Sequence, residues 1–425
     1  MIDIKLLRAD PDRFRWAAKV KKIDADIDGL LRVDRRLLEI QRKLQDIRTT
    51  QNETGKQIAE LKKGPGTQEL IEEMTRHKQQ AKEYQAELEA RRGSFNKLMM
   101  LVCQPPDEGV PVGADDTENV EVRRVGEVRQ FDFEPKDHVQ LGQALDIIDV
   151  ERGVKLAGTR NYVLKGAGAA LHQAVLRLAV DQMVAKGYTL LTVPVLVREE
   201  VMYGTGYFPV GRDQAYLAER DGLSLVGTAE VPVTALHSGE ILTEAELPRK
   251  YVALSTCFRR EAGAAGKDTY GLYRIHFFDK VEQVIVAAND KAQSIAFHQE
   301  ILANAEDVLN ALELPYRVVD VCTGDLGQGQ VQKFDIETWM PSRNSFGETH
   351  SASRFYEFQA RRLNLRYRDA DNKVRFCHTL NNTVIASPRI LISLLELNQN
   401  ADGSVTIPQA LRPYMKGMEK IEPPE

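Results

Sequence analysis

The sequence has 425 residues, of which 43% are hydrophobic and 28% charged, and its formal net charge is −5. This composition is typical of a globular protein of two or three domains and excludes a disordered or collagen-like chain. No apolar run reaches the roughly 18–20 residues of a membrane helix, the N-terminus lacks a signal-peptide pattern, and the four cysteines are scattered. We therefore expect a protein of the reducing cytoplasm that has neither disulfides nor a zinc site. We expect neither a membrane nor DNA as its partner.

The first hundred residues differ in charge from the rest of the chain. Residues 1–102 carry 22 Lys+Arg and 17 Asp+Glu, a net of +5, which leaves −10 for the remainder. Such an asymmetry is found in modules that bind a polyanion. Basic residues mixed with acidic ones are more often a solvated helix face, and charge alone favours that interpretation.

The apolar residues of this segment recur at intervals of three and four. One such track spans residues 30–61 and a second spans 70–102, with Gly64-Pro65-Gly66 between them. The spacing is typical of a coiled coil and the break predicts a tight turn. We expect an antiparallel helical hairpin over about residues 27–100, with arms roughly 50 Å long, that projects from the body as an arm. The alternative is half of a helical bundle, which usually has a wider apolar face.

Residues 104–118 are rich in Gly, Pro and Asp and predict a linker. Beyond it, helical periodicity alternates with short strand-like runs. We expect helices over 169–186 and 292–311, and strands over 190–197, 252–260, 276–286, 318–322 and 334–340. Because several strands are consecutive in sequence, this region predicts an α+β fold with a mainly antiparallel sheet and helices packed on it. The sequence contains neither a P-loop nor a G-x-G-x-x-G that follows a strand.

Three segments carry candidate chemistry, and the first is a strand, a Gly-rich loop and a returning strand. Arg259 and Glu261 are two residues apart, and Arg274, Phe278 and Glu282 have even spacing, so each set shares a strand face. Arginine, an aromatic ring and carboxylates suit a nucleotide, because guanidinium binds phosphate, the ring stacks on a base and the acids accept hydrogen bonds or hold Mg²⁺. The alternative is a surface hairpin with cross-strand ion pairs.

The second segment is a strand that ends in polar residues and leads into a helix with Pro388 in its first turn. Arg389 then lies near a helix N-terminus, where its positive charge is unfavourable. Either a bound anion or a pair with an acid such as Glu396 would explain it. The third segment, residues 187–194, is the end of a helix and a strand that ends in Pro194, which alone predicts only an edge strand.

Together these segments resemble the three motifs of class II aminoacyl-tRNA synthetases. Residues 170–197 resemble motif 1, residues 252–286 resemble motif 2, and residues 374–398 resemble motif 3. Within this class the chain is similar, over almost its whole length, to seryl-tRNA synthetases of the common bacterial and eukaryotic type. The similarity includes the predicted coiled coil and Thr228-Ala229-Glu230. It implies an N-terminal tRNA-binding domain (1–103) with the arm, the linker, a class II catalytic domain (119–425) and a homodimer.

The resemblance also implies an activity and a set of site residues. The activity is ATP-dependent conversion of L-serine to seryl-adenylate and transfer to the terminal adenosine of tRNA-Ser, with tRNA-Sec as a further candidate. The implied catalytic residues are Arg259, Glu261 and Arg389, and the implied serine-binding residues are Thr228, Ala229, Glu230, Arg259, Glu282, Asn381 and Thr383. ATP would contact Arg259, Arg260, Glu261, Arg274, Phe278, Glu348, Thr349, His350, Ser351 and Arg389, and Glu348 and Ser351 would hold Mg²⁺. On the arm, tRNA would contact Arg35, Arg36, Arg42, Lys43, Arg48 and Lys56, together with Lys62 and Lys63.

The chain departs from the family pattern at three places. Gly347 stands where Arg or Tyr is common, His350 replaces the first serine of the usual E-[IVL]-S-S-C-S run, and Thr383 replaces the serine of L-N-G-S-G. Threonine keeps the hydroxyl, and we expect His350 to be a hydrogen-bonded loop histidine and not a metal ligand. Two alternative functions stay open. The arm argues against a ligase that charges a carrier protein, and the intact arginines and acids argue against an inactive RNA-binding paralogue.

Overall fold

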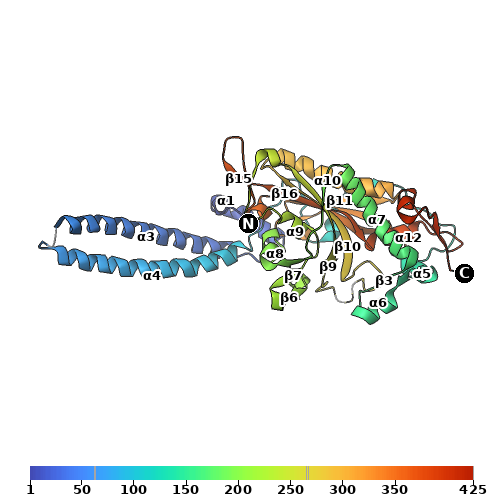
Figure 1. Ribbon diagram of the computed structural model, residues 1–425, viewed down its shortest axis with the longest axis horizontal. Helices are drawn as coiled ribbons and strands as arrows, with labels where there is room; N and C mark the ends of the chain where they lie inside the picture. Colours follow the sequence, from blue (N-terminus) through green and yellow to red (C-terminus); the bar gives the residue numbers. More distant parts are fainter. Residues whose placement is uncertain (62–63, 265, 267, 425) are drawn as a thin grey trace. The chain divides into compact units, whose positions relative to one another are not determined.

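The computed structural model describes residues 1–61, 64–264, 266 and 268–424 (Figure 1). Four residues discussed above lie outside the described residues: Lys62 and Lys63 of the arm, and Ala265 and Lys267 of the Gly-rich loop. The chain divides into two compact units, Ile2–Cys103 and Gln104–Glu425. In the part that the structure describes, no helix has the length and apolar character needed to cross a membrane. All four cysteines are buried and free.

The smaller unit is helical. Its helices are α1 (Ile4–Ala9), α2 (Pro11–Val20), α3 (Ile27–Leu61) and α4 (Thr67–Met99). Helices α3 and α4 lie side by side as a long hairpin (Figure 1). Leu30, Leu37, Ile40 and Ile47 of α3, which all belong to the predicted track of three- and four-residue spacing, are buried. The predicted helical hairpin is therefore confirmed.

A charged pair and a glycine support this hairpin. Arg36 of α3 donates two hydrogen bonds to Glu87 of α4, at 2.9 and 2.8 Å. Gly66 has a φ of +92° directly before α4, a backbone conformation that glycine adopts without the strain of a side chain. The predicted Gly-Pro-Gly break thus coincides with the turn between the helices.

The larger unit is built on an eight-stranded sheet. In spatial order its strands are β1 (Val120–Val125), β11 (Tyr316–Asp320), β12 (Gln332–Met340), β13 (Ser345–Tyr356), β16 (His378–Ser387), β10 (Phe277–Ala287), β9 (Arg249–Phe258) and β4 (Thr189–Leu191). All neighbouring strands are antiparallel except β4 and β9. The predicted α+β fold with a mainly antiparallel sheet is confirmed.

Four smaller sheets and several short helices complete this unit. The smaller sheets are formed by β5 (Leu196–Arg198), β7 (Leu223–Leu225) and β6 (Leu217–Ala218), by β15 (Val374–Phe376), β14 (Arg366–Arg368) and β8 (Ile241–Thr243), by β2 (Ile148–Asp149) and β3 (Val163–Leu164), and by β17 (Val405–Thr406) and β18 (Lys420–Ile421). The short helices are α5 (His138–Ala144), α6 (Val150–Ala157), α8 (Glu199–Thr205), α9 (Glu230–Thr234) and α11 (Phe358–Leu363).

Three longer helices cover one face of the large sheet: α7 (Gly166–Ala185), α10 (Lys291–Ala311) and α12 (Arg389–Leu397) (Figure 1). Val281 and Ile285 of β10 are fully buried in the core that these helices share with the sheet. Burial of each such side chain contributes about 1.5–3 kcal/mol to the free energy of unfolding. Because strand side chains alternate, Phe278, Lys280 and Glu282 point to the opposite face. There they line a pocket.

Two strand predictions are wrong in detail. The strand expected over 190–197 is divided into β4 and β5, since Pro194 lies in an irregular segment between them. The strand expected to reach Arg260 ends at Phe258. Arg259 and Glu261 therefore do not share a strand face, and Glu261 has a φ of +52° in the turn that follows.

Residues 104–118, expected to be a linker, belong to the larger unit. The backbone N–H groups of Gln104 and Asp107 donate to the carbonyl groups of Gln328 and Val331, both at 2.9 Å. The extended backbone of this stretch is therefore hydrogen-bonded along the segment that leads into β12.

Candidate active site

A pocket of about 250 Å³ lies on the sheet face opposite the three helices. Strands β10, β13 and β16 supply most of its walls, and the β9–β10 loop (residues 259–276), α9, the start of α12, strand β12 and single residues of two other loops supply the rest. It brings together most of the predicted site residues: Glu230, Arg259, Glu261, Phe278, Glu282, Glu348, Thr349, His350, Ser351, Asn381, Thr383 and Arg389. Residues that are more than 150 positions apart in the sequence thus meet at one site.

Four predicted residues lie elsewhere. Thr228 and Ala229 are buried directly before α9, where the Thr228 hydroxyl accepts a hydrogen bond from the Glu230 N–H at 3.1 Å. Arg274 lines an adjoining pocket, together with Arg259 and Glu261. Arg260 is exposed and lines neither pocket, so the prediction that it contacts ATP is not supported by its position.

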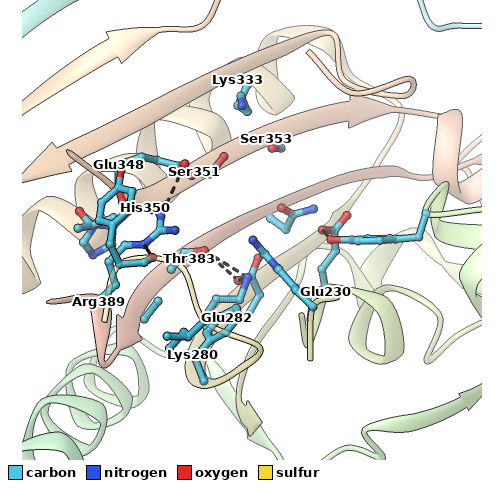
Figure 2. Close-up of a pocket in the computed structure, with 18 of the residues that line it drawn as sticks. Glu230, Lys280, Glu282, Lys333, Glu348, His350, Ser351, Ser353, Thr383 and Arg389 are labelled. Atoms are coloured by element: carbon cyan, nitrogen blue, oxygen red, sulfur yellow. Dashed lines mark hydrogen bonds and ion pairs between the residues drawn. The ribbon is translucent and has the colours of Figure 1, made fainter. Parts of the chain in front are cut away.

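At one part of the pocket a lysine, a carboxylate and a hydroxyl form a buried cluster. Lys280 Nζ lies 2.5 Å from Glu282 Oε2, and the two side chains are 6% and 2% exposed. Thr383 Oγ1 lies 3.3 Å from both the Lys280 ammonium and the Glu282 carboxylate (Figure 2). The bulge in the pairing of β10 with β16 begins at Glu282 and places Thr383 opposite it. A buried ion pair beside a hydroxyl can both donate to and accept from a small polar ligand.

A second buried acid, Glu230, lines the same pocket. Its two carboxylate oxygens accept hydrogen bonds from Gln359 Nε2 at 2.8 Å and from the Tyr207 hydroxyl at 3.1 Å. Burial, with a further contribution from the negative charge of Glu282, raises the pKa of Glu230 to about 7. This carboxylate therefore gains strongly from a bound cation such as an ammonium group.

Two arginines, Arg259 and Arg389, line the same pocket, and Arg274 lines the adjoining one. The Arg259 guanidinium lies 5.1 Å from the centroid of the Phe278 ring. Arg274 Nη1 donates to Glu261 Oε2 at 2.8 Å. Arg389 donates through Nε to the Tyr273 carbonyl at 3.0 Å and through Nη1 to the Glu348 carbonyl at 2.8 Å. Guanidinium groups held in this way suit the oxygens of a polyphosphate.

Glu348 and Ser351 offer hard oxygen donors beside these arginines. The Glu348 side chain is 49% exposed and Ser351 lines the same pocket (Figure 2). Partial desolvation by the pocket walls opposes ionisation of Glu348, but the positive charges of Arg389 and Lys333 outweigh it and hold its pKa below the usual value. Among the described residues, no group of three or more His, Cys, Asp or Glu could hold a metal. One carboxylate and one hydroxyl fit a Mg²⁺ whose other ligands are phosphate oxygens and water.

The structure shows the surroundings of His350 and Gly347, two of the three departures from the family pattern. His350 lies in β13 and is 1% exposed, so the expected loop histidine is a strand residue. Its Nδ1 lies 2.8 Å from Thr349 Oγ1, and its Nε2 has no hydrogen-bond partner among the described residues. A Cβ at Gly347 would lie 3.0 Å from Tyr273 Cε2, so the glycine leaves room for that ring. Burial lowers the pKa of His350 to about 3, so it is neutral.

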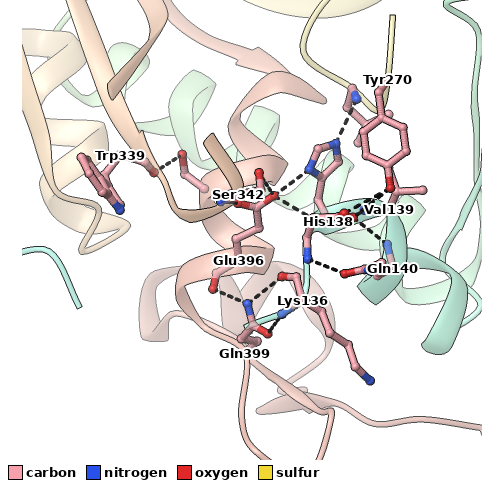
Figure 3. A network of polar contacts seen from close by, with 12 residues as sticks. Lys136, His138, Val139, Gln140, Tyr270, Trp339, Ser342, Glu396 and Gln399 are labelled. Atoms are coloured by element: carbon pink, nitrogen blue, oxygen red, sulfur yellow. Dashed lines mark hydrogen bonds and ion pairs between the residues drawn. The ribbon is translucent and has the colours of Figure 1, made fainter. Parts of the chain in front are cut away.

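The partner of Arg389 is not Glu396. Besides the two carbonyls, the Arg389 guanidinium lies 3.7 Å from the Glu348 carboxylate. Glu396 instead accepts hydrogen bonds from His138 and Ser342, and none of these three residues lines the pocket (Figure 3). Of the two explanations for a cation at this helix N-terminus, pairing with Glu396 is therefore wrong.

Several lining residues were not predicted from the sequence: Tyr207, Tyr273, Ile275, Lys280, Gln330, Lys333, Ser353 and Ala386. Lys280 could have been found, because it lies between Phe278 and Glu282 at even spacing on β10. No local pattern marks Gln330 or Lys333. They reach the site only because β12 pairs with β13.

A mainly antiparallel sheet that carries these arginines and acids on one face, with a helix that begins at Arg389, defines the catalytic core of a class II aminoacyl-tRNA synthetase. A family model described as the tRNA synthetase class II core domain (G, H, P, S and T) matches residues 216–398, and one described as the seryl-tRNA synthetase N-terminal domain matches residues 1–105. The serine–tRNA ligase of Deinococcus radiodurans is 43% identical over the full length of both chains. That of Thermotoga petrophila is 45% identical over 99% of this chain and 100% of its own. The chain belongs to the seryl-tRNA synthetase family.

Solved structures of seryl-tRNA synthetases are also similar to this chain. The seryl-tRNA synthetase from Pyrococcus horikoshii, complexed with ATP, has a TM-score of 0.95 at 35% identity and covers 100% of both chains. The cytoplasmic serine–tRNA ligase from Naegleria fowleri, in complex with AMP, has a TM-score of 0.90 at 27% identity, over 100% of this chain and 99% of its own.

Proposed function

We propose that this chain activates L-serine with ATP to seryl-adenylate and transfers serine to the 3′-terminal adenosine of tRNA-Ser. The observation that carries this proposal is a single pocket that joins the buried Lys280–Glu282–Thr383 cluster to the arginines Arg259 and Arg389. Membership of the seryl-tRNA synthetase family supports the same substrates.

The acidic part of the pocket suits serine. Glu230, with its raised pKa, would bind the ammonium group, and Arg259 would bind the carboxylate. Glu282 and Thr383 would hydrogen-bond the hydroxyl, and Asn381 lines the wall beside them. Alanine would leave these polar groups without a ligand partner, and a site of this kind can reject such an analogue by about 10⁴.

The arginine part suits ATP. Phe278 would stack on the adenine, Glu261 would accept from its amino group, Arg274 would bind the γ-phosphate and Arg389 the α-phosphate. The serine carboxylate then attacks the α-phosphate in line and pyrophosphate leaves. A carboxylate is already a nucleophile, so the residues contribute by positioning and by stabilising charge.

Glu348 and Ser351 would hold the Mg²⁺ of ATP, and Thr349 and His350 lie beside them on β13. When bound, the ion neutralises charge on the phosphates. Arg389 bonds the Glu348 carbonyl and so keeps this strand close to the start of α12.

Serine-dependent exchange of pyrophosphate into ATP tests the activation step. Arg259→Ala should lower the exchange rate by about 10²–10³, the cost of losing one preorganised donor to developing charge. Arg220→Ala, an exposed arginine outside the pocket, is the matched control. An exchange rate in Arg259→Ala equal to wild type would refute the role of Arg259, and no exchange in the wild type would favour an inactive paralogue.

The helical hairpin would bind tRNA. Arg35, Arg42, Arg48 and Lys56 of α3 are exposed, whereas Arg36 and Lys43 already pair with acids of the arm. A rod with basic residues can read the shape of an RNA through its phosphates. Deleting residues 31–95 should leave exchange intact and abolish charging of tRNA-Ser. Unchanged charging would refute this, charging of a carrier protein would favour the alternative ligase, and the same assay tests tRNA-Sec.

Homodimer formation through motif 1 is the remaining part of the proposal. Leu190 of β4, the edge strand of the large sheet, and Val184 of α7 are each 46% exposed. Exposed apolar side chains on a sheet edge are typical of an interface. A molecular mass of one chain in solution, about 47.9 kDa, would contradict it.

A further inference from the structure

Glu396 is a fully buried carboxylate in α12, the helix that begins with Arg389. It accepts hydrogen bonds from the backbone N–H of His138 at 3.0 Å and from its Nδ1 at 2.7 Å. The backbone N–H and hydroxyl of Ser342 also donate to it, both at 2.8 Å (Figure 3). Four donors offset the cost of burying this charge. The carboxylate therefore joins α12 to two other segments of the chain.

The hydrogen bonds of His138 determine which of its two ring nitrogens carries the proton. Its Nε2 lies 3.1 Å from the backbone nitrogen of Leu272, and a backbone N–H can only donate. Nε2 must therefore be the unprotonated acceptor, and Nδ1 must carry the proton that is donated to Glu396. A neutral imidazole thus connects a fixed carboxylate in α12 to the β9–β10 loop.

The loop is in close contact with this imidazole. Gly271 has a φ of +70°, and a Cβ at this position would lie 2.1 Å from His138 Nε2. Of the two residues after Leu272, Tyr273 lines the pocket and Arg274 lines the adjoining one. The Tyr273 carbonyl accepts from Arg389 Nε, and Arg274 pairs with Glu261. The hydrogen bond from Leu272 is therefore one residue away from a group that orients Arg389.

Other contacts also hold the same loop, among them those of Arg160 and Tyr270. Arg160 donates to the carbonyl groups of Ala264 at 2.7 Å and Arg274 at 3.1 Å. The Tyr270 hydroxyl donates to Asp137 at 3.1 Å. Loss of the His138 contact should therefore shift the loop at Leu272 and not release it altogether.

We propose that His138 is a positioning residue for ATP. Through Leu272 it sets the backbone that places Arg274 and the Tyr273 carbonyl, and through Glu396 it ties this loop to the helix of Arg389. His138 does not line the ATP pocket, so it acts on the nucleotide only through these residues. The proposal rests on the proposed function, because the expected effect is on the KM for ATP.

Two substitutions separate the two nitrogen atoms. The amide of His138→Asn can replace Nδ1 as donor to Glu396 but leaves the Leu272 N–H without its acceptor. The longer His138→Gln can place an amide oxygen near the position of Nε2. In pyrophosphate exchange, His138→Asn should raise the KM for ATP about fivefold to tenfold, the effect of one lost hydrogen bond, with the KM for serine unchanged. His138→Gln should stay within about twofold of wild type. His378→Asn, a buried histidine that bonds Ser294 at 2.7 Å, controls for loss of a core imidazole.

A loop variant tests the contact from its other side. Gly271→Ala would place a methyl group 2.1 Å from His138 Nε2 and adds the strain of a positive φ, so it must displace this contact and should raise the KM for ATP by at least a similar factor. The double variant should be no worse than either single variant, because both break the same contact. An unchanged KM for ATP in His138→Asn, an equal rise in His138→Gln, or fully additive effects would each overturn the proposal.

Hydrogen exchange gives a readout that is independent of activity. The amides of the segment around Leu272 should exchange faster in His138→Asn than in wild type or His138→Gln, without any ligand. Unchanged exchange would overturn the proposal. If the wild type lacked serine-dependent exchange of pyrophosphate, the proposed function would fail, but this measurement would still report on the contact between His138 and the loop.

Discussion

Glu230→Gln should stabilise the fold while it weakens serine binding. The substitution keeps the shape of the side chain, and the Gln amide can still accept from Gln359 and can bond the Tyr207 hydroxyl. What it removes is a buried charge. Its effect on the free energy of unfolding should therefore depend on pH.

The magnitude follows from the pKa of Glu230, which burial raises from 4.5 to about 7. A group whose folded-state pKa is raised contributes stability that is present below pH 4.5 and is lost as the pH rises through 7. At 1.36 kcal/mol per pKa unit, the wild type loses about 1 kcal/mol by pH 5 and about 3 kcal/mol by pH 8 through this group. The glutamine does not titrate, so the variant should be more stable than wild type by about these amounts.

Urea unfolding of both proteins at pH 5 and pH 8 measures this difference, since contributions from groups that do not interact with Glu230 cancel between them. The KM for serine is the second measurement. In the wild type it should fall between pH 6 and pH 8 as the carboxylate ionises and can bind ammonium, and in the variant it should be higher and nearly independent of pH. A stability difference that is the same at both pH values would refute the reasoning.

Two further substitutions test the two parts of the pocket. Lys280→Met leaves Glu282 buried without its cation and should cost about 3–5 kcal/mol in the free energy of unfolding, with a raised KM for serine; a change below 1 kcal/mol in urea unfolding would contradict the buried pair. Arg389→Lys keeps the charge, but its single nitrogen cannot take the places of both Nε and Nη1, which bond the Tyr273 and Glu348 carbonyls, so kcat for pyrophosphate exchange should fall by at least tenfold. An unchanged kcat would show that the planar guanidinium is not needed.

Short-range patterns predicted much of this structure. The three- and four-residue spacing of apolar side chains predicted α3 and α4, and Gly66 lies in the turn between them because it adopts a left-handed backbone. The alternation on β10 placed Phe278 and Glu282 on one face, and the pocket lies on that face. These features depend on neighbours a few residues apart, which a single sequence displays directly.

The rest depends on pairing between distant strands and on backbone turns. Strand β9 ends at Phe258 because a turn follows, in which Glu261 has a positive φ. A glutamate at this position does not predict such a turn. Lys333 enters the pocket only through the register of β12 on β13. The partners of Arg389 are carbonyl groups, which every residue carries, so no sequence pattern could have distinguished them from the carboxylate of Glu396.

The limited space beside Gly347 restricts the substitutions that this position can accept. The ring of Tyr273 occupies the volume that a side chain at position 347 would need, and the guanidinium groups of Arg343 and Arg389 lie 4.1 and 4.4 Å from its centroid. Met340 Sδ lies as close to that position, at 3.0 Å, so a larger residue at 347 should be accommodated only where both Tyr273 and Met340 give way. A compound that reaches past Arg389 toward this ring should therefore bind more weakly to a variant that carries a side chain at position 347.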